Sequence, residues 1–313
     1  MNRLLVIASS PHIRSEMSTA RIMAWVMVAL TPAGLAGVYF FGLRSILVVL
    51  TCIVSCVVTE AVWQKCTKQK VTVSDLSAAV TGLLLAYNTP SSIPLWMAVI
   101  GSVFAMVIVK HFFGGLGQNI VNPALAGRAV MLICWPVAMT TWTLHGISTP
   151  TPLAILKGVG SSGAALPSFF EAFLGGIGGC IGETSALALL FGGCLLIYKG
   201  VISWRIPVTY IVTVAVLSLL LGRPGGPLLE ITAGGLILGA FFMATDYATS
   251  PMTPKGQFIF ALGCGAITSL IRTFGGYPEG VSYSILIMNL TVPIIDRMTM
   301  PRVFGEAKNH GSK

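Results

Sequence analysis

Polar side chains stand in four short clusters within a chain that is otherwise strongly apolar. One cluster is Lys110-His-Phe-Phe-Gly-Gly-Leu-Gly-Gln-Asn-Ile-Val-Asn-Pro123, followed by Arg128. Its glycines allow close backbone approach, and Gln118, Asn119 and Asn122 offer amide donors and acceptors. The spacing is not that of a dinucleotide-binding loop, and no strand precedes it. A ligand contact and a re-entrant turn that satisfies its own amides are equal alternatives here.

Two further clusters place a carboxylate where an apolar run begins or ends. Glu183 lies in Gly178-Gly-Cys-Ile-Gly-Glu-Thr-Ser185 at the start of a predicted helix. There Glu183, Thr184 and Ser185 cap free backbone N–H groups or contact a ligand. Asp246 ends an apolar helix and is followed by hydroxyls and two prolines. A surface turn and a cation or ligand contact are equal alternatives for Asp246.

The fourth cluster is rich in hydroxyls and proline: Gly146-Ile-Ser-Thr-Pro-Thr-Pro-Leu153. Its composition alone is that of a turn. The seven cysteines of the chain form no Cys-x-x-Cys pair and its four histidines are scattered. We therefore predict no zinc or iron–sulfur site within this chain.

The elements that position these clusters are apolar segments of membrane length. The chain has 313 residues, of which 55% are hydrophobic and only 9% charged. A soluble domain would carry about a quarter charged residues. The sequence therefore predicts a single all-α polytopic membrane domain over residues 1–313, with about ten transmembrane helices. We place them near 22–42, 45–63, 76–88, 95–112, 124–141, 180–198, 206–222, 228–245, 257–273 and 281–297.

The distribution of basic residues sets the expected orientation. With the N-terminus inside, 15 of the 19 Lys and Arg residues fall on the inner side and 4 on the outer side. This bias predicts that both termini are cytoplasmic and that the longest loop, about 142–179, is extracytoplasmic. The net charge of +9 therefore reflects topology, and nucleic acid is not an expected partner.

An internal repeat is indicated by two equal offsets. Pro90 and Pro251, and likewise Gly114 and Gly275, are 161 residues apart in similar surroundings. We predict two five-helix repeats, at about 20–141 and 180–298, followed by a cytoplasmic tail at 299–313. Because five is odd, the second repeat would be inverted, as in many transporter folds.

Together these segments resemble the NqrB/RnfD family of membrane flavoproteins. The resemblance covers nearly the whole chain. The matching segments are Ser74-Asp75, Thr81-Gly-Leu-Leu-Leu, Gly114 to Arg128, Gly182-Glu-Thr-Ser185, Ala244-Thr-Asp246 with the tail Ser250-Pro-Met-Thr-Pro254, and Asn289 to Arg297. The chain lacks the longer N-terminal extension of the quinone reductase B subunits. The D subunits of Rnf ion-translocating oxidoreductase complexes are therefore the expected closer group.

The resemblance implies an FMN whose phosphate is esterified to a threonine. The family pattern Ser-Gly-Ala-Thr-Pro-Leu is matched by Ser148-Thr-Pro-Thr-Pro-Leu153, so Thr151 falls on the flavin-bearing residue, with Ser148 and Thr149 beside it. Pro150 stands where alanine is usual, and His145 where aspartate is common. Thr149 is the alternative acceptor.

The resemblance also implies a second, non-covalent flavin, riboflavin or FMN, within the bundle. Its expected contacts are Gln118, Asn119, Glu183, Thr184 and Asp246. Electron flow would be coupled to Na⁺ or H⁺ movement. The candidates for that coupling are the carboxylates Asp75, Glu183 and Asp246, since a carboxylate inside a membrane needs a cation or a proton.

The implied function is that of a membrane subunit in a ferredoxin:NAD oxidoreductase translocase, without catalysis by this chain alone. Its expected partners are the other membrane subunits, a flavin-bearing G subunit, soluble iron–sulfur and NADH-binding subunits, and a flavin transferase, in the inner (plasma) membrane. A secondary transporter or channel without flavin is the main alternative. A purely structural anchor is another.

Overall fold

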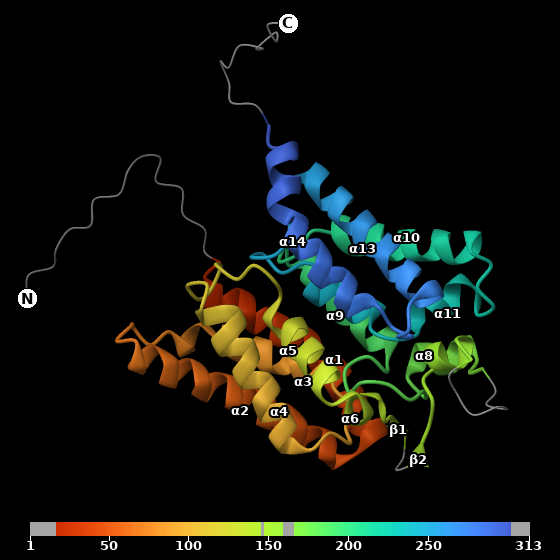
Figure 1. The fold of residues 1–313 in the computed structure, drawn as a ribbon, viewed down its shortest axis with the longest axis horizontal. Coiled ribbons are helices and arrows are strands. Elements are labelled where there is room, and N and C mark those ends of the chain that lie inside the picture. Colours follow the sequence, from red (N-terminus) through yellow and green to blue (C-terminus); the bar gives the residue numbers. More distant parts are fainter. Residues whose placement is uncertain (1–16, 145–146, 159–165, 302–313) are drawn as a thin grey trace, which may run out of the picture.

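The chain folds into two groups of helices that lie side by side. The computed structural model describes residues 17–144, 147–158 and 166–301. Figure 1 shows the helices from α1 to α6 in one group and those from α10 to α14 in the other. The described part is predominantly helical, as expected, and its one sheet is a hairpin of two strands with two residues each.

The first group begins with two long helices. Ser18 caps α1 by accepting a hydrogen bond from the backbone N–H of Arg21, and Gly42, at φ +76°, separates α1 from α2. Asn122 caps α5 in the same way as Ser18 caps α1. The elements are α1 (Thr19–Phe41), α2 (Leu43–Cys66), η1 (Val73–Asp75), α3 (Ser77–Tyr87), α4 (Leu95–Phe104), η2 (Ala105–His111), α5 (Pro123–Cys134) and α6 (Pro136–Thr140).

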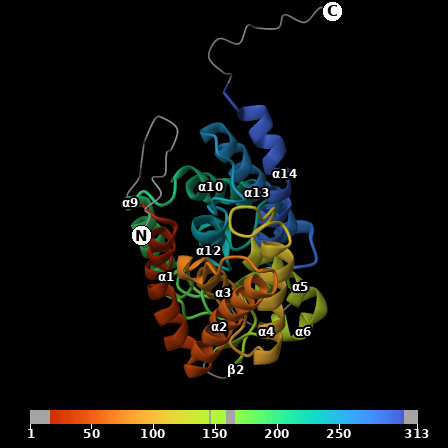
Figure 2. The same cartoon turned by 90° about the vertical axis from the view of Figure 1, so that its left-hand side faces the viewer.

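A short connecting region leads to the second group. It contains β1 (Thr143–Leu144), β2 (Ile147–Ser148), α7 (Pro152–Leu156) and α8 (Phe169–Leu174). The second group comprises α9 (Ala186–Tyr198), α10 (Arg205–Leu220), α11 (Gly226–Thr232), α12 (Leu236–Leu238), η3 (Gly239–Met243), α13 (Pro254–Phe274) and α14 (Val281–Thr299). Along two seams, α1 packs on α9 and α5 packs on α14 (Figure 2).

Three helices are long and apolar enough to cross a membrane. They are Thr19–Phe41, Leu43–Cys66 and Pro254–Phe274. The pair Gly226–Thr232 and Leu236–Met243 passes the same test together, but its two parts are bent by 64°. Several other apolar helices are shorter, between 10 and 17 residues. The described residues therefore form a helical membrane protein, with fewer full-length spans than the ten apolar segments suggested.

Three of the expected spans are interrupted. The segment at 124–141 stops at Trp135, because Pro136 cannot donate its backbone hydrogen bond. The segment at 228–245 breaks at Ala233, which is extended, and Gly234, which has a φ of +69°. The segment at 180–198 becomes helical only at Ala186. These breaks leave non-helical backbone inside the protein, and candidate site residues such as Glu183 lie on it.

The contact between α2 and α3 leaves no room for a side chain at Gly82. A Cβ atom added there would lie 2.7 Å from both the carbonyl oxygen of Cys52 and the Cα of Ile53. Both atoms belong to backbone and cannot rotate away. We expect Gly82→Ala to lower the free energy of unfolding by about 1–3 kcal/mol, as overpacking of a tight core does. The loss would appear as a lower melting temperature in detergent.

Gly179→Ala is the matched control. An added Cβ at Gly179 meets no atom within 4 Å, so its melting temperature is expected to stay close to that of the wild type. Equal melting temperatures for both variants would contradict the close helix contact.

Candidate functional site

A cavity of about 460 Å³ lies where the connecting region meets α5 and α14. Its wall combines a cation, an anion, hydroxyls and aromatic rings from distant parts of the chain. They include Arg128, Leu132, Trp142, Thr149, Pro150, Ala154, Tyr277, Glu279, Ser282 and Tyr283. The volume is within the range of about 300–1,000 Å³ that holds small organic ligands in proteins.

The predicted acceptor loop borders this cavity. The backbone N–H of Thr149 donates to the carbonyl of Trp142 at 3.0 Å, which extends the β1–β2 hairpin. Thr149 and Pro150 form part of the wall. The Thr149 hydroxyl is buried and has no hydrogen-bond partner among the described residues. The backbone of Ser148 lies in β2, and His145 lies outside the described residues.

Thr151 stands one residue beyond this wall, at the start of α7. It is 4% exposed, and its hydroxyl accepts a hydrogen bond from the backbone N–H of Ala154 at 3.2 Å. Pro152 then begins the helix, where its missing N–H is not needed. The predicted acceptor thus lies between two residues of the cavity wall, Pro150 and Ala154, and its own hydroxyl is used in the helix cap.

Lys157 fixes the far end of this loop. Its ammonium group donates to the carbonyl oxygens of Ile271 at 3.2 Å and Tyr277 at 2.7 Å. Burial, and secondarily the charge of Arg223, lowers the pKa of Lys157. The acceptor loop is therefore tied to the turn between α13 and α14 that forms the opposite wall.

Arg128 projects from α5 and is 6% exposed. It forms an ion pair with Glu279 and donates a hydrogen bond to Ser282, and one of its terminal nitrogens lies 3.8 Å from the sulfur of Cys180. The buried Nε of Arg128 has no hydrogen-bond partner in the described structure. Sequence reasoning missed Glu279, which lies in an ordinary Pro-Glu-Gly turn 151 residues away from Arg128.

Glu183 is held by an extended segment that pairs with the end of α3. The backbone N–H of Ile181 donates to the carbonyl of Thr89 at 3.1 Å, and that of Gly182 donates to the carbonyl of Tyr87 at 3.0 Å. A side chain at Gly182 would overlap the ring of Tyr87. The backbone must pass this close to Tyr87 to carry Glu183 into the interior, and only glycine permits it.

The capping role expected for this segment falls to one residue. Ser185 caps α9 by accepting from the backbone N–H of Ala188 at 3.3 Å. Glu183 is 3% exposed, and neither of its oxygens has a hydrogen-bond partner within the described ranges. The buried hydroxyl of Thr184 likewise has none. The alternative in which Glu183 caps a helix is therefore wrong.

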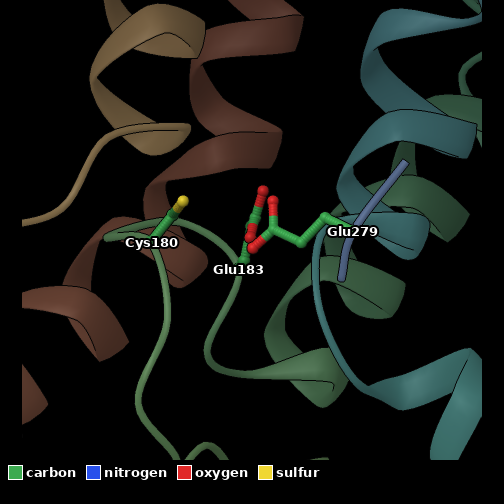
Figure 3. Close-up of side chains that lie close together, drawn as sticks. All are labelled: Cys180, Glu183 and Glu279. Atoms are coloured by element: carbon green, nitrogen blue, oxygen red, sulfur yellow. The ribbon is translucent and has the colours of Figure 1, made fainter. Parts of the chain in front are cut away.

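Glu183 instead faces Glu279, as Figure 3 shows. Ligand atoms of Cys180, Glu183 and Glu279 lie within 4.8 Å of one another, and all three side chains are buried. Arg128 contacts both Glu279 and Cys180. A guanidinium thus already stands where a metal cation would, so we assign no metal to this cluster.

A second, smaller cavity is lined by residues of both groups. It has a volume of about 90 Å³, and Asn119, Asn122 and Asp246 are among its lining residues. The amide of Asn122 donates to the carbonyl of Met243 at 3.3 Å. Asp246 accepts from the hydroxyl of Thr249 at 3.1 Å. Two predicted contacts, Asn119 and Asp246, therefore share one space.

The other predicted contacts do not join this smaller cavity. Gln118 is exposed and does not line it. Asp75 is half-buried at the end of η1, just before α3, and accepts from the backbone N–H and the hydroxyl of Ser77, at 2.8 and 2.7 Å. Glu183 lies at the opposite end of α3. The three ion-coupling candidates Asp75, Glu183 and Asp246 are thus spread over separate places.

A buried ion pair beside the smaller cavity was not foreseen from the sequence. The ammonium of Lys110 donates to Glu60 and to the hydroxyl of Ser77, each at 2.7 Å. The imidazole of His111 lies 3.7 Å from the same carboxylate. The side chains of Lys110 and Glu60 are 3% and 1% exposed. A Lys-His pair in an apolar segment was the available signal, but its partner is 50 residues away.

Comparison with known proteins gives one consistent result. Residues 6–305 match the model of the family described as NQR2, RnfD, RnfE. The D subunit of the Na(+)-translocating ferredoxin:NAD(+) oxidoreductase complex of Acetobacterium woodii is 54% identical, over 98% of each chain. Its proton-translocating counterpart from Clostridium ljungdahlii is 49% identical, over 96% of each. The D subunit of the ion-translocating oxidoreductase complex of Escherichia coli (strain K12) is 37% identical, over 96% of this chain and 99% of its own.

Proposed function

The chain belongs to the NQR2, RnfD, RnfE family, and on that premise we propose that it is the D-type membrane subunit of an ion-translocating ferredoxin:NAD oxidoreductase complex. It would act with the other subunits of that complex and not as an enzyme alone. The names of two close relatives specify Na⁺ and protons respectively. The coupling ion proposed for this chain is accordingly Na⁺ or H⁺.

We propose further that the chain carries a covalent FMN on Thr151. The observation that carries this proposal is the 460 Å³ cavity bordered by the acceptor loop. Trp142, Tyr277 and Tyr283 offer aromatic faces for a planar ring, and Arg128 offers a cation. Arg128, Thr149 and Ser282 add polar residues to the same wall. These residues fit a flavin.

Each of these residues has a separate task in the proposal. A bound flavin supplies the exchange of one or two electrons. Thr151 holds it at a fixed reach, and the tie of Lys157 to α13 and the adjoining turn keeps the acceptor loop against the cavity. Arg128 and Glu279 together place an ion pair at the wall, which makes that side of the cavity polar. The aromatic walls limit access of water.

The proposed topology keeps the two inverted five-helix repeats. Support comes from the order of elements. Adding 161 to the residue numbers of α4 and η2 (95–111) gives 256–272, which lies inside α13. Adding 161 to those of α5 (123–134) gives 284–295, which lies inside α14. Under the same offset, the residues that correspond to α3 follow the bend at Gly234. Both termini would be cytoplasmic and the acceptor loop extracytoplasmic, in the inner membrane.

The second, non-covalent flavin stays a prediction. The cavity that contains Asn119 and Asp246 has a volume of about 90 Å³, below the usual range for organic ligands. Binding there would require apolar neighbours such as Leu116 or Phe241 to move aside.

The test of this function is the covalent flavin itself. The full chain, expressed with an active flavin transferase, is expected to fluoresce as a flavoprotein on a denaturing gel and to gain the mass of an esterified FMN. A wild-type band without fluorescence, beside a fluorescent relative made by the same transferase, would contradict the proposal. It would favour the alternative of a transporter or channel with the same helices and no flavin.

A further inference from the structure

Two buried carboxyl groups face each other next to the cavity that we propose for FMN. Glu183 comes from the segment before α9, and Glu279 comes from the turn before α14. Their carboxyl groups point toward one another (Figure 3) and their oxygens lie within 4.8 Å. Glu279 also lines the cavity, whereas Glu183 does not. Glu279 therefore connects a fully enclosed carboxyl group to the proposed cofactor space.

The pair carries more acidic groups than its immediate cation can neutralise. Arg128 is ion-paired with Glu279. Apart from the thiol of Cys180, no donor reaches either oxygen of Glu183 in the part of the chain that the structure describes. An ionised carboxylate that is buried without a donor is strongly disfavoured, and two carboxylates at this separation do not both stay ionised. A proton on Glu183, by contrast, has Glu279 as an acceptor beside it.

The remaining charged and titratable groups around Glu183 do not supply the missing donor. Arg272, on α13, lies across the Gly234–Gly235 turn, but its guanidinium donates to Glu230 at 2.8 Å and to the carbonyls of Glu230 and Ala233. The positive charge of Arg272 is thus already paired.

Three further groups complete the surroundings. Arg223 binds the other oxygen of Glu230 and is the more exposed member of that network. The hydroxyl of Tyr87 donates to the carbonyl of Leu30, away from Glu183. The thiol of Cys180, a weak donor, is the remaining neighbour.

We infer that Glu183 and Glu279 form a redox-linked proton site, in which Glu183 holds a proton at rest and Glu279 takes up a second one when an electron enters the adjacent cavity. That Glu183 is protonated at rest follows from the geometry of the two carboxyl groups alone. The redox-linked part rests on the proposed FMN.

Charge and protons balance in each state. At rest, protonated Glu183, ionised Glu279 and Arg128 sum to zero. An electron, supplied by a one-electron carrier that draws on reduced ferredoxin, adds one negative charge beside Arg128. One proton from water then binds a carboxylate oxygen of Glu279, and Arg128 compensates the new charge in the cavity. On reoxidation the electron passes to the next carrier and the proton leaves. The site therefore couples electron arrival to uptake of one proton.

The experiment compares wild type with Glu183→Gln, which keeps the shape of the side chain and cannot titrate. Infrared difference spectra of the purified chain at neutral pH are expected to show the C=O stretch of a protonated carboxyl group in wild type and its loss in the variant. This band does not require any flavin. If wild type and variant have the same carboxyl absorption, Glu183 is ionised at rest and the inference fails.

The redox link is read from the midpoint potential of the flavin as a function of pH. Uptake of a proton by Glu279 with the electron makes the potential fall as pH rises, so Glu279→Gln, which cannot take up that proton, is expected to give a shallower slope than wild type. Glu183→Gln stays neutral like the protonated resting carboxyl group and should keep the wild-type slope. Equal slopes in Glu279→Gln and wild type would overturn the link. Absence of covalent flavin in wild type would remove the proposed function and the link, while the infrared band would still decide the resting state.

Glu171→Gln is the matched control for both measurements. Glu171 is exposed in the capping box of α8, and glutamine preserves that box. Hydrogen bonds from the backbone and hydroxyl of Ser168 hold the pKa of Glu171 below its usual range, so it is already ionised at neutral pH. Neither the carboxyl band nor the slope is expected to change in this variant.

Discussion

Thr151→Ala is expected to remove all covalent flavin fluorescence from the chain on a denaturing gel. The phosphoester needs a side-chain hydroxyl, and alanine has none, so the loss should be complete and should include the mass increase. Thr151 also caps α7 through the N–H of Ala154, and loss of a cap costs about 1 kcal/mol. That cost is too small to unfold the protein, so the variant remains measurable as a folded chain.

Thr149→Val is the control for this result, because valine keeps the shape of threonine and removes the hydroxyl. The Thr149 hydroxyl has no partner in the described structure, so its removal leaves no other group unsatisfied. Fluorescence retained in Thr149→Val and lost in Thr151→Ala assigns the attachment to Thr151. The reverse pattern would move it to Thr149, a residue of the cavity wall.

Lys110→Met is expected to lower the free energy of unfolding by about 3–5 kcal/mol. Glu60 is 1% exposed and one of its oxygens already lacks a partner within the described residues, so losing Lys110 leaves a buried charge without its cation. Methionine fills nearly the same volume, and the effect is therefore electrostatic. Thermal unfolding in detergent, followed by the fraction that remains monodisperse, measures it.

The double variant Glu60→Gln/Lys110→Met should recover most of this loss, because it removes both charges together. Lys70→Met, at an exposed position in the loop after α2, should leave the melting temperature nearly unchanged. A double variant that is no more stable than Lys110→Met alone would show that the lysine acts through packing and not through its charge.

The sequence was informative wherever a local rule decides the structure. Apolar runs predicted most helices, and the segment expected from 124 does begin there, since Asn122 caps α5 and Pro123 is its first residue. The same rules show why the helix predicted at 124–141 is interrupted: Pro136 sits inside it, and its missing N–H outweighs the continuous apolar pattern. The prediction of about ten spans treated all apolar runs alike, whereas several of them form helices of 10–17 residues and one pair is bent by 64°.

The candidate site was only partly predictable for a different reason. Thr149, Thr151 and Glu183 were found because a local motif surrounds each of them. The partners that give these residues an environment come from far along the chain. Glu279 lies 151 residues from Arg128, and Glu230 lies 42 residues from Arg272. Nothing in a single sequence states such pairings, since they depend on which breaks and bends bring the helices together.

The two cavities share one helix, and this sets a length scale for communication between them. Asn122, at the start of α5, lines the smaller cavity, and Arg128, six positions later, lines the larger one. At 1.5 Å per residue, the two walls are about 9 Å apart along the helix axis. With an effective dielectric constant near 20, a unit charge gained in one cavity changes the energy of a charge in the other by about 2 kcal/mol. Occupancy on one side of α5 can thus change affinity on the other side more than tenfold while the backbone stays still.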